Sequence, residues 1–96
     1  MKLHVLAGVI PAETKLIRDD KVSGGWARSQ TFARHRERYE VLLHRKRGSK
    51  EHFLAEQVII IRDGIRDRTT LACSCGEVVS GKVYEPTLNR MIKHLG

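Results

Sequence analysis

The sequence predicts a small α+β domain, in which an antiparallel sheet of three to five strands is packed by an amphipathic C-terminal helix and a second, basic helix. Three observations lead to this fold class. The chain has 96 residues, 41% of them hydrophobic, which provides for one small core of modest stability. Short β-branched segments bounded by glycine-containing turns are typical of strands. The last segment repeats its apolar residues at the spacing of a helix.

The N-terminal quarter predicts a strand or hairpin followed by a linker. Residues Leu3 to Ile10 alternate apolar side chains and favour a strand, which Pro11 ends. Thr14 to Arg18 return as a second short strand. The polar stretch 19–25 contains two consecutive glycines and is the best linker candidate. We therefore expect an N-terminal unit of residues 1–25 and one α+β domain of residues 26–96, with elements in the order α-β-β-β-α.

The segment after the linker admits two interpretations. Ser29 suits a helix N-cap, and residues Gln30 to Arg38 favour a helix because several of them have high helix propensity. From Tyr39 to Leu43 the apolar residues fit either a continued helix or a strand. The turn residues in Arg47 to Lys50 favour the strand. We therefore expect a basic helix up to Arg38 and a strand after it.

The C-terminal half has clearer signals. Val58 to Ile61 is short and β-branched, as in a buried strand. Asp63-Gly64 marks a tight turn, and Thr69 to Cys75 return as the neighbouring strand. Pro86 suits the first position of a helix. The apolar residues that follow recur at i, i+3, i+4 and i+7 and predict an amphipathic helix: Leu88, Met91, Ile92 and Leu95.

Positive charge is concentrated in the middle of the chain. The basic window from Arg28 to Lys50 holds eight basic and two acidic residues, so it carries +6 of the net charge of +7. A compact basic segment is the expected mark of a surface that contacts phosphate. All eight basic residues are therefore candidate nucleic-acid contacts: Arg28, Arg34, Arg36, Arg38, Arg45, Lys46, Arg47 and Lys50.

Nucleic-acid binding is accordingly the leading functional hypothesis, with DNA expected more than RNA. Trp26 precedes the basic window, and Phe32 and Tyr39 lie within it, either to stack on bases or to join the core. Because the chain holds only five aromatic residues, contact with a duplex backbone is favoured over a single-strand stacking platform. The competing hypothesis is a protein-interaction module, such as a phage-type accessory or virion component that docks on an acidic protein surface.

Cys73 and Cys75, with His94 near the chain end, form a candidate metal site. Residues two apart on a strand point to the same side, so both sulfurs can face one ion. Zn²⁺ prefers four thiolate and imidazole ligands in a tetrahedron. A fourth ligand would come from His44, His52 or water. The alternatives are inert, half-buried thiols, a reactive thiol pair, and a histidine that only interacts with the helix dipole.

Catalysis has little support in the sequence. Paired carboxylates, a phosphate-binding loop and a nucleophile elbow are all missing from it. Cys75 and His94 would form a thiol–imidazole pair, but no motif orients the imidazole or supplies an oxyanion hole. We therefore expect a protein that is not an enzyme.

The C-terminal third resembles a known kind of module through a pattern of seven residues: Leu71, Cys73, Cys75, Gly76, Gly81, His94 and Leu95. It is similar to the short CxCG…HL modules of small actinobacterial and phage proteins and, more loosely, to a ββα zinc finger. The zinc-finger resemblance implies a structural metal. The chain departs from the finger in having one residue between its cysteines and 18 between Cys75 and His94.

A second resemblance, to double-stranded-RNA-binding domains, rests on the α-β-β-β-α order and on two short motifs, Tyr39-Glu40-Val41 and His52…Glu56…Val58. Those domains begin their last helix with a lysine-rich segment that binds phosphates. The corresponding residues 81–86 hold one lysine.

The cysteines also bear on the compartment. Two cysteines separated by one residue are a poor disulfide framework, so we expect a reducing cytosol. No run of 18 apolar residues exists to form a membrane span.

Overall fold

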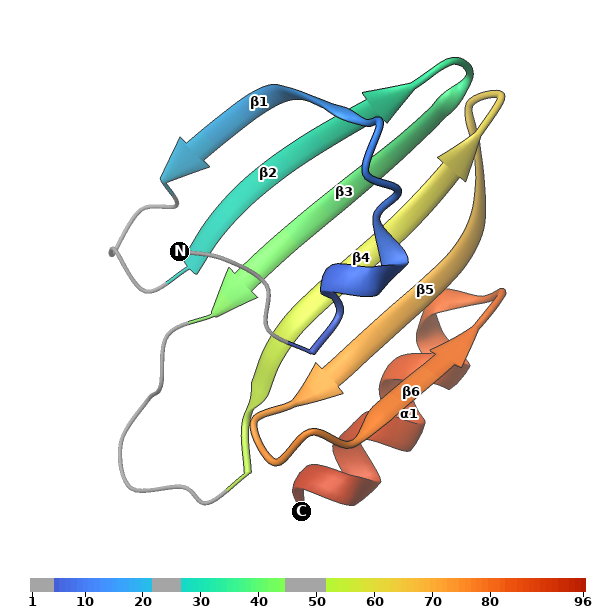
Figure 1. Ribbon diagram of the computed structural model, residues 1–96. Coiled ribbons are helices and arrows are strands. Elements are labelled where there is room, and N and C mark those ends of the chain that lie inside the picture. The colour runs from blue at the N-terminus through green and yellow to red at the C-terminus, as the bar shows by residue number, and fades with distance from the viewer. Residues whose placement is uncertain (1–4, 22–26, 45–51) are drawn as a thin grey trace.

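Six antiparallel strands follow one another across a single sheet in chain order, and one α-helix follows the last strand (Figure 1). The structure is a computed structural model, and it describes residues 5–21, 27–44 and 52–96. The fold is therefore α+β, as predicted. The elements are η1 Ala7–Val9, β1 Lys15–Lys21, β2 Ala27–Arg34, β3 Glu37–His44, β4 Leu54–Arg62, β5 Ile65–Cys73, β6 Val78–Gly81 and α1 Tyr84–Leu95.

The β4–β5 hairpin forms the centre of the core. Its strands contain the β-branched run that predicted a buried strand, and Val58 lies opposite Thr70 in the ladder. The turn between them places Asp63 at φ 51° and Gly64 at φ 79°. Two consecutive left-handed residues are characteristic of the tight hairpin turns that Asp-Gly sequences favour. The strand predicted for Val58 to Ile61 and the turn are both confirmed here, but the neighbouring strand predicted for Thr69 to Cys75 ends at Cys73, so Cys75 lies in the following turn.

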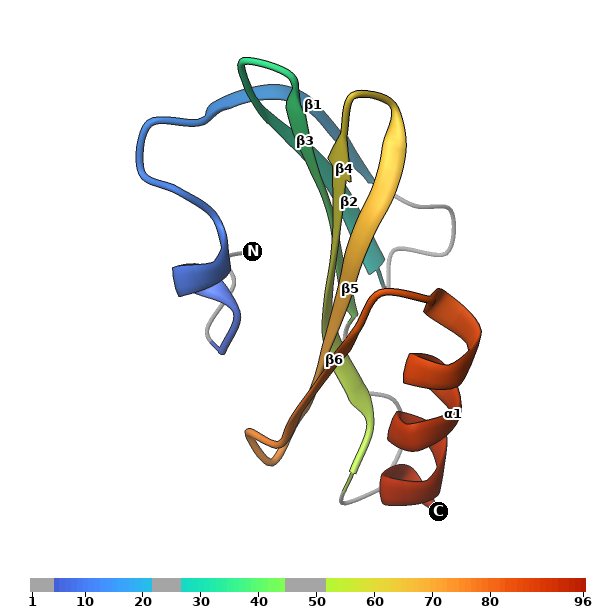
Figure 2. The ribbon, with the colours of Figure 1, turned by 90° about the vertical axis from the view of Figure 1, so that its right-hand side faces the viewer.

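The N-terminal segment covers one face of the sheet, which we call the N-terminal face (Figure 2). Leu6 packs there against the buried side chains of Tyr39 and Val58. The backbone N–H groups of Val5 and Leu6 donate to the buried Glu56 carboxylate at 2.9–3.1 Å. These hydrogen bonds compensate for burying a charged group and hold the segment on the sheet.

Helix α1 covers part of the opposite face, which we call the helix face (Figure 2). Met91 is fully buried against Leu71 and Cys73, and the helix packs on β5 and β6. The predicted amphipathic helix is thus confirmed. Gly81 of β6 lies so close to Thr87 that a Cβ atom would stand well inside van der Waals contact with Thr87 Oγ1. The helix therefore approaches the sheet closely at this point.

The second, basic helix is not formed, and the prediction for Gln30 to Arg38 is wrong. These residues form the end of β2, a turn at His35 and Arg36, and the start of β3. Helix propensity is a weak preference that tertiary contacts override. Here β2 gains ladders on both sides, with Phe32 lying between Leu16 of β1 and Tyr39 of β3. The strand predicted from Tyr39 onward is confirmed as β3.

Two further expectations need correction. The sheet has six strands rather than three to five, because β2 and β6 add to those expected. Residues 5–10 of the expected Leu3–Ile10 strand form a bend and η1, since the amides of Val5 and Leu6 bond to a side chain instead of a ladder. The division at residue 25 stays a prediction. In the described ranges, no helix has the length and apolar character to cross a bilayer.

Candidate metal centre

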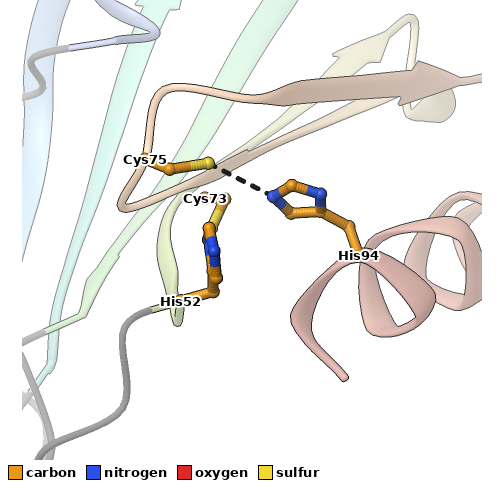
Figure 3. Close-up of side chains that lie close together, drawn as sticks. All are labelled: His52, Cys73, Cys75 and His94. Carbon is orange, nitrogen blue, oxygen red and sulfur yellow. Dashed lines mark hydrogen bonds between the residues drawn. The ribbon is translucent and has the colours of Figure 1, made fainter.

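Four side chains from three separate chain segments converge at one end of the sheet (Figure 3). His52 precedes β4, Cys73 ends β5, Cys75 lies in the β5–β6 turn, and His94 lies in the last turn of α1. Their ligand atoms all lie within 4.8 Å of one another. We call this group the His/Cys cluster.

Backbone hydrogen bonds beyond the regular ladder place His52 beside the cysteines. The N–H of Ser74 donates to the Phe53 carbonyl at 2.9 Å, and the N–H of Phe53 donates to Ser74 Oγ at 3.2 Å. The pairing of β4 with β5 is thereby prolonged by one residue on each chain segment. Because His52 directly precedes Phe53, its imidazole is held next to Cys73.

The tight β5–β6 turn brings the second sulfur over the first. The N–H of Gly76 donates to the Cys73 carbonyl at 2.9 Å, and the N–H of Cys73 donates to the Glu77 carbonyl at 2.9 Å. Gly76 has φ 98°, a conformation that side chains rarely adopt. Gly76 therefore permits the tight turn.

Two sulfur–nitrogen separations lie near the value for tetrahedral metal coordination. Cys73 Sγ lies 3.5 Å from His52 Nδ1, and Cys75 Sγ lies 3.2 Å from His94 Nε2. Zn–S and Zn–N bonds of about 2.3 and about 2.05 Å at the tetrahedral angle separate a sulfur from a nitrogen by about 3.5 Å. The two imidazole rings, with centroids 5.0 Å apart, meet nearly edge to face. The four groups therefore lie close enough to hold a metal ion.

The environment of Cys73 favours its thiolate. The residue is fully buried, and burial raises the pKa of its thiol. Hydrogen bonds from the Cys75 backbone, the His52 ring and neighbouring side chains outweigh burial and lower this pKa from 9.0 to about 6. A thiolate is the form that binds metals. Cys75, by contrast, is exposed, so the cluster opens to solvent on its side.

The structure brings together every residue predicted for the metal site. Cys73, Cys75 and His94 all belong to the His/Cys cluster. Of the two histidines considered for the fourth position, His52 occupies it, and the side chain of His44 lies outside the described part of the chain. Both cysteines are free thiols.

No protein-family model, no curated protein and no solved structure matches the chain. The resemblance to CxCG…HL modules therefore stays a prediction. The topological resemblance to double-stranded-RNA-binding domains requires a helix before the first of three strands, and residues 27–34 form β2 in its place.

The basic window does not form one cationic surface within the described residues. Its first three arginines bind carboxylates of the same chain. Arg28 donates two hydrogen bonds to Asp19 at 2.6 and 2.7 Å, Arg34 binds Glu13 and Glu37, and Arg36 lies 3.6 Å from Asp63. These contacts raise the pKa of Arg28 and Arg34 through the hydrogen bonds with their carboxylate partners.

Arg38 differs from those three arginines. It is exposed, and its Nη1 donates to the backbone carbonyl of Glu37 at 3.1 Å. Register places it on the helix face, opposite Ile61, whereas Arg34 lies opposite Glu37 on the N-terminal face. The remaining candidates, Arg45, Lys46, Arg47 and Lys50, lie outside the described residues.

Two of the three aromatic residues considered for base stacking belong to the core instead. Tyr39 is 2% exposed and belongs to the core of the N-terminal face, and Phe32 packs partly buried against the same core. Trp26 lies outside the described residues. Base stacking on Tyr39 would require opening the core, so it is not a nucleic-acid contact.

Proposed function

We propose that this chain is a zinc protein in which the His/Cys cluster binds one structural Zn²⁺. The observation that carries the proposal is the convergence of two sulfurs and two imidazole nitrogens within 4.8 Å. Thiolate and imidazole ligands in a tetrahedral set favour zinc over magnesium or calcium, which prefer oxygen ligands.

A structural role suits the number of ligands. Zinc sites that support catalysis keep one position open for water or substrate, whereas structural sites are closed by four protein ligands. The His/Cys cluster offers four. This agrees with the expectation that the chain is not an enzyme.

The metal would join three chain segments: the residues before β4, the β5–β6 turn and the end of α1. Helix α1 has 12 residues, and a helix of this length is marginal unless it packs on something. Zinc on His94 would tie the end of α1 to the β5–β6 turn and to the segment before β4. Zinc that binds the folded chain and not the unfolded chain stabilises the folded state. At a free zinc concentration 100 times the Kd, the free energy of unfolding rises by about 2.7 kcal/mol.

Metal analysis of the purified full chain tests this proposal. The chain is stripped with a chelator, reloaded with Zn²⁺, dialysed and analysed, and we expect one zinc per chain. Replacement by Co²⁺ should give the visible absorption of a tetrahedral site with thiolate ligands. Cys75→Ser and His94→Ala should each lose stoichiometric metal.

The matched control is His35→Ala, which removes an exposed histidine from the β2–β3 turn. It should bind zinc as the wild type does. A wild type that retains no zinc after reloading, with the same melting curve in chelator and in zinc, would overturn the proposal. So would ligand variants that retain metal as the control does.

We further propose that this zinc protein binds nucleic acid, with duplex DNA as the preferred class. The observation that favours it is a surplus of positive charge after the described ion pairs are formed. Arg38 and six further exposed cations have no ion-pair partner among the described residues: Lys15, Arg66, Arg68, Lys82, Arg90 and Lys93.

Retention on duplex DNA over a range of salt concentrations tests this second function. We expect log K to fall linearly with log salt, with a slope of about −0.9 for each phosphate contacted. Absence of binding at low salt would refute it. Pull-down with and without nuclease tests the competing hypothesis of an acidic protein partner. A protein that is still captured after nuclease treatment supports protein docking and counts against nucleic-acid binding.

A further inference from the structure

The part of the helix face that α1 leaves bare extends over β1, β2 and β3 (Figure 2). Helix α1 packs on β5 and β6, and no other described element lies over this face. The bare area is hollowed by about 250 Å³, and its lining mixes polar and apolar side chains: Ser29, Thr31, Glu40, Val41, Leu42, Gln57 and Ile59. This hollow is therefore not a large contiguous apolar patch of the kind that marks an apolar partner.

Strand register aligns three cations across this bare face. Lys15 lies opposite Ala33, which lies opposite Arg38; Arg38 lies opposite Ile61, which lies opposite Arg66. Directly opposed residues of antiparallel strands project to the same face. All three cations are exposed, and the residues between them are small or apolar. We call Lys15, Arg38 and Arg66 the cationic row.

The cationic row lacks the carboxylate partners that bind Arg28, Arg34 and Arg36. None of its members forms an ion pair within the described ranges. With strands about 4.8 Å apart, five strands place its two ends about 19 Å apart. That distance is the rise of about five to six base pairs of duplex DNA.

We infer that the cationic row is the docking surface for the phosphate backbone of a nucleic-acid duplex. This inference rests on the proposed nucleic-acid binding and names its surface. Charge complementarity and exposure carry it, because each cation is exposed and has no ion-pair partner among the described residues. Two of the three, Lys15 and Arg66, lie outside the basic window, so only the folded sheet brings them into one line with Arg38.

The chemistry of the row selects a duplex over a single strand. Single-strand binders stack bases on exposed aromatic side chains, whereas Ala33 and Ile61 separate these cations. The row therefore meets phosphates and offers no stacking platform. Sequence-independent backbone contact of this kind is strongly salt dependent.

Glu40 provides a second, opposite test of the surface. It lines the hollow of the bare face and lies one row from Arg38, opposite Thr31 and Ile59. Its carboxylate would repel a phosphate backbone on this face. Removing that charge should therefore strengthen binding, an outcome that damage to the fold would not produce.

The test compares charge changes of equal size on a 20-base-pair DNA duplex at several salt concentrations. Arg38→Glu/Arg66→Glu is compared with Arg68→Glu/Lys82→Glu. Arg68 faces the other side of the sheet, opposite Ile60. Glu40→Gln is compared with Glu85→Gln, an exposed residue in the first turn of α1. Zinc content and melting temperature verify that each variant is folded.

We expect the row variant to bind more weakly than its control and to reduce the magnitude of the salt slope by about 1.8. Glu40→Gln should bind more tightly than Glu85→Gln. If the wild type binds and both double variants lose affinity equally, the row is refuted while nucleic-acid binding stands. If the wild type does not bind duplex DNA, the proposed nucleic-acid function itself fails.

Two other results would overturn the inference. In the first, the wild type binds a single strand of the same sequence more tightly than the duplex; in the second, it captures an acidic protein in the presence of nuclease. In either case the three cations would not be the binding surface for a duplex backbone.

Discussion

Replacing Gly81 by alanine should displace helix α1 and with it His94, the proposed metal ligand on the helix. The added Cβ would overlap Thr87 Oγ1 and lie 3.0 Å from Arg90 Nη2. The Arg90 side chain is long and exposed and can move aside. Thr87 is 1% exposed, and its hydroxyl donates to the Val83 carbonyl at 2.7 Å, so it cannot move without the helix.

The cost follows from this fixed contact. Inserting a methyl group into a well-packed contact costs about 1–3 kcal/mol. To relieve the overlap, α1 must move away from β6 until the contact reaches an ordinary van der Waals distance, a movement of about 1 Å or more. The Cys75 Sγ to His94 Nε2 separation is 3.2 Å, so such a movement would also spoil the coordination geometry. Zinc affinity should therefore fall together with stability.

Chemical denaturation in chelator and in zinc measures both effects. Gly8→Ala is the matched control, since a Cβ at Gly8 meets nothing within 4 Å. A double-mutant cycle with Thr87→Ala sharpens the test, because removing Oγ1 removes the obstacle. Gly81→Ala should cost less in the Thr87→Ala background than in the wild type, with a coupling of about 0.5–3 kcal/mol.

Two results would refute this reasoning. Equal effects of Gly81→Ala and Gly8→Ala would mean that α1 does not approach β6 at Thr87. A full cost of Gly81→Ala in both backgrounds would mean that the backbone of β6, rather than the contact with the helix, requires glycine.

Three further predictions concern stability. The hydrogen bond from Arg62 is the main cause that lowers the pKa of Glu37 below 4.5. Because this pKa is lower in the folded chain than in the unfolded chain, the stabilisation is present above pH 4.5 and is lost as pH falls. In denaturation curves, Glu37→Gln should therefore reduce the loss of stability at acid pH. Glu56→Gln removes a buried charge that accepts the N-terminal amides, and should cost about 1.5–3 kcal/mol and speed proteolysis of residues 5–10. Met91→Ala should cost about 2–5 kcal/mol in thermal or chemical melts, whereas Ile92→Ala, 52% exposed, should stay within about 0.5 kcal/mol; equal effects would contradict the packing of α1.

The sequence predicted those parts of the fold whose apolar residues repeat with a clear period. The run Val58 to Ile61 and the helix with Met91 at its centre each show one period strongly, and both were predicted correctly. In β2 the only large apolar side chain is Phe32, so neither a period of two nor one of 3.6 is visible. The ladders with β1 and β3 decide that segment, and ladders join residues that the local sequence does not relate.

The same division applies to the candidate site. Cysteine and histidine are recognisable as metal ligands from their chemistry alone, so Cys73, Cys75 and His94 were identified without a structure. The choice of His52 as their partner depends on the pairing of Phe53 with Ser74, which no spacing rule predicts. The cationic row depends on register across five strands and on irregularities in two of the ladders. Charge counted along the chain pointed instead to the basic window, whose first three arginines bind carboxylates of the same chain.

The order in which the strands lie in the sheet has a kinetic consequence. Each strand pairs with its neighbours in the chain, so every hairpin closes only a short loop, and low contact order is associated with fast folding. The N-terminal segment is different, because Leu6 reaches a carboxylate 50 residues away. We expect the six-stranded sheet to form first and the N-terminal segment to pack on it last. Mutations in the N-terminal segment should therefore accelerate unfolding far more than they slow refolding.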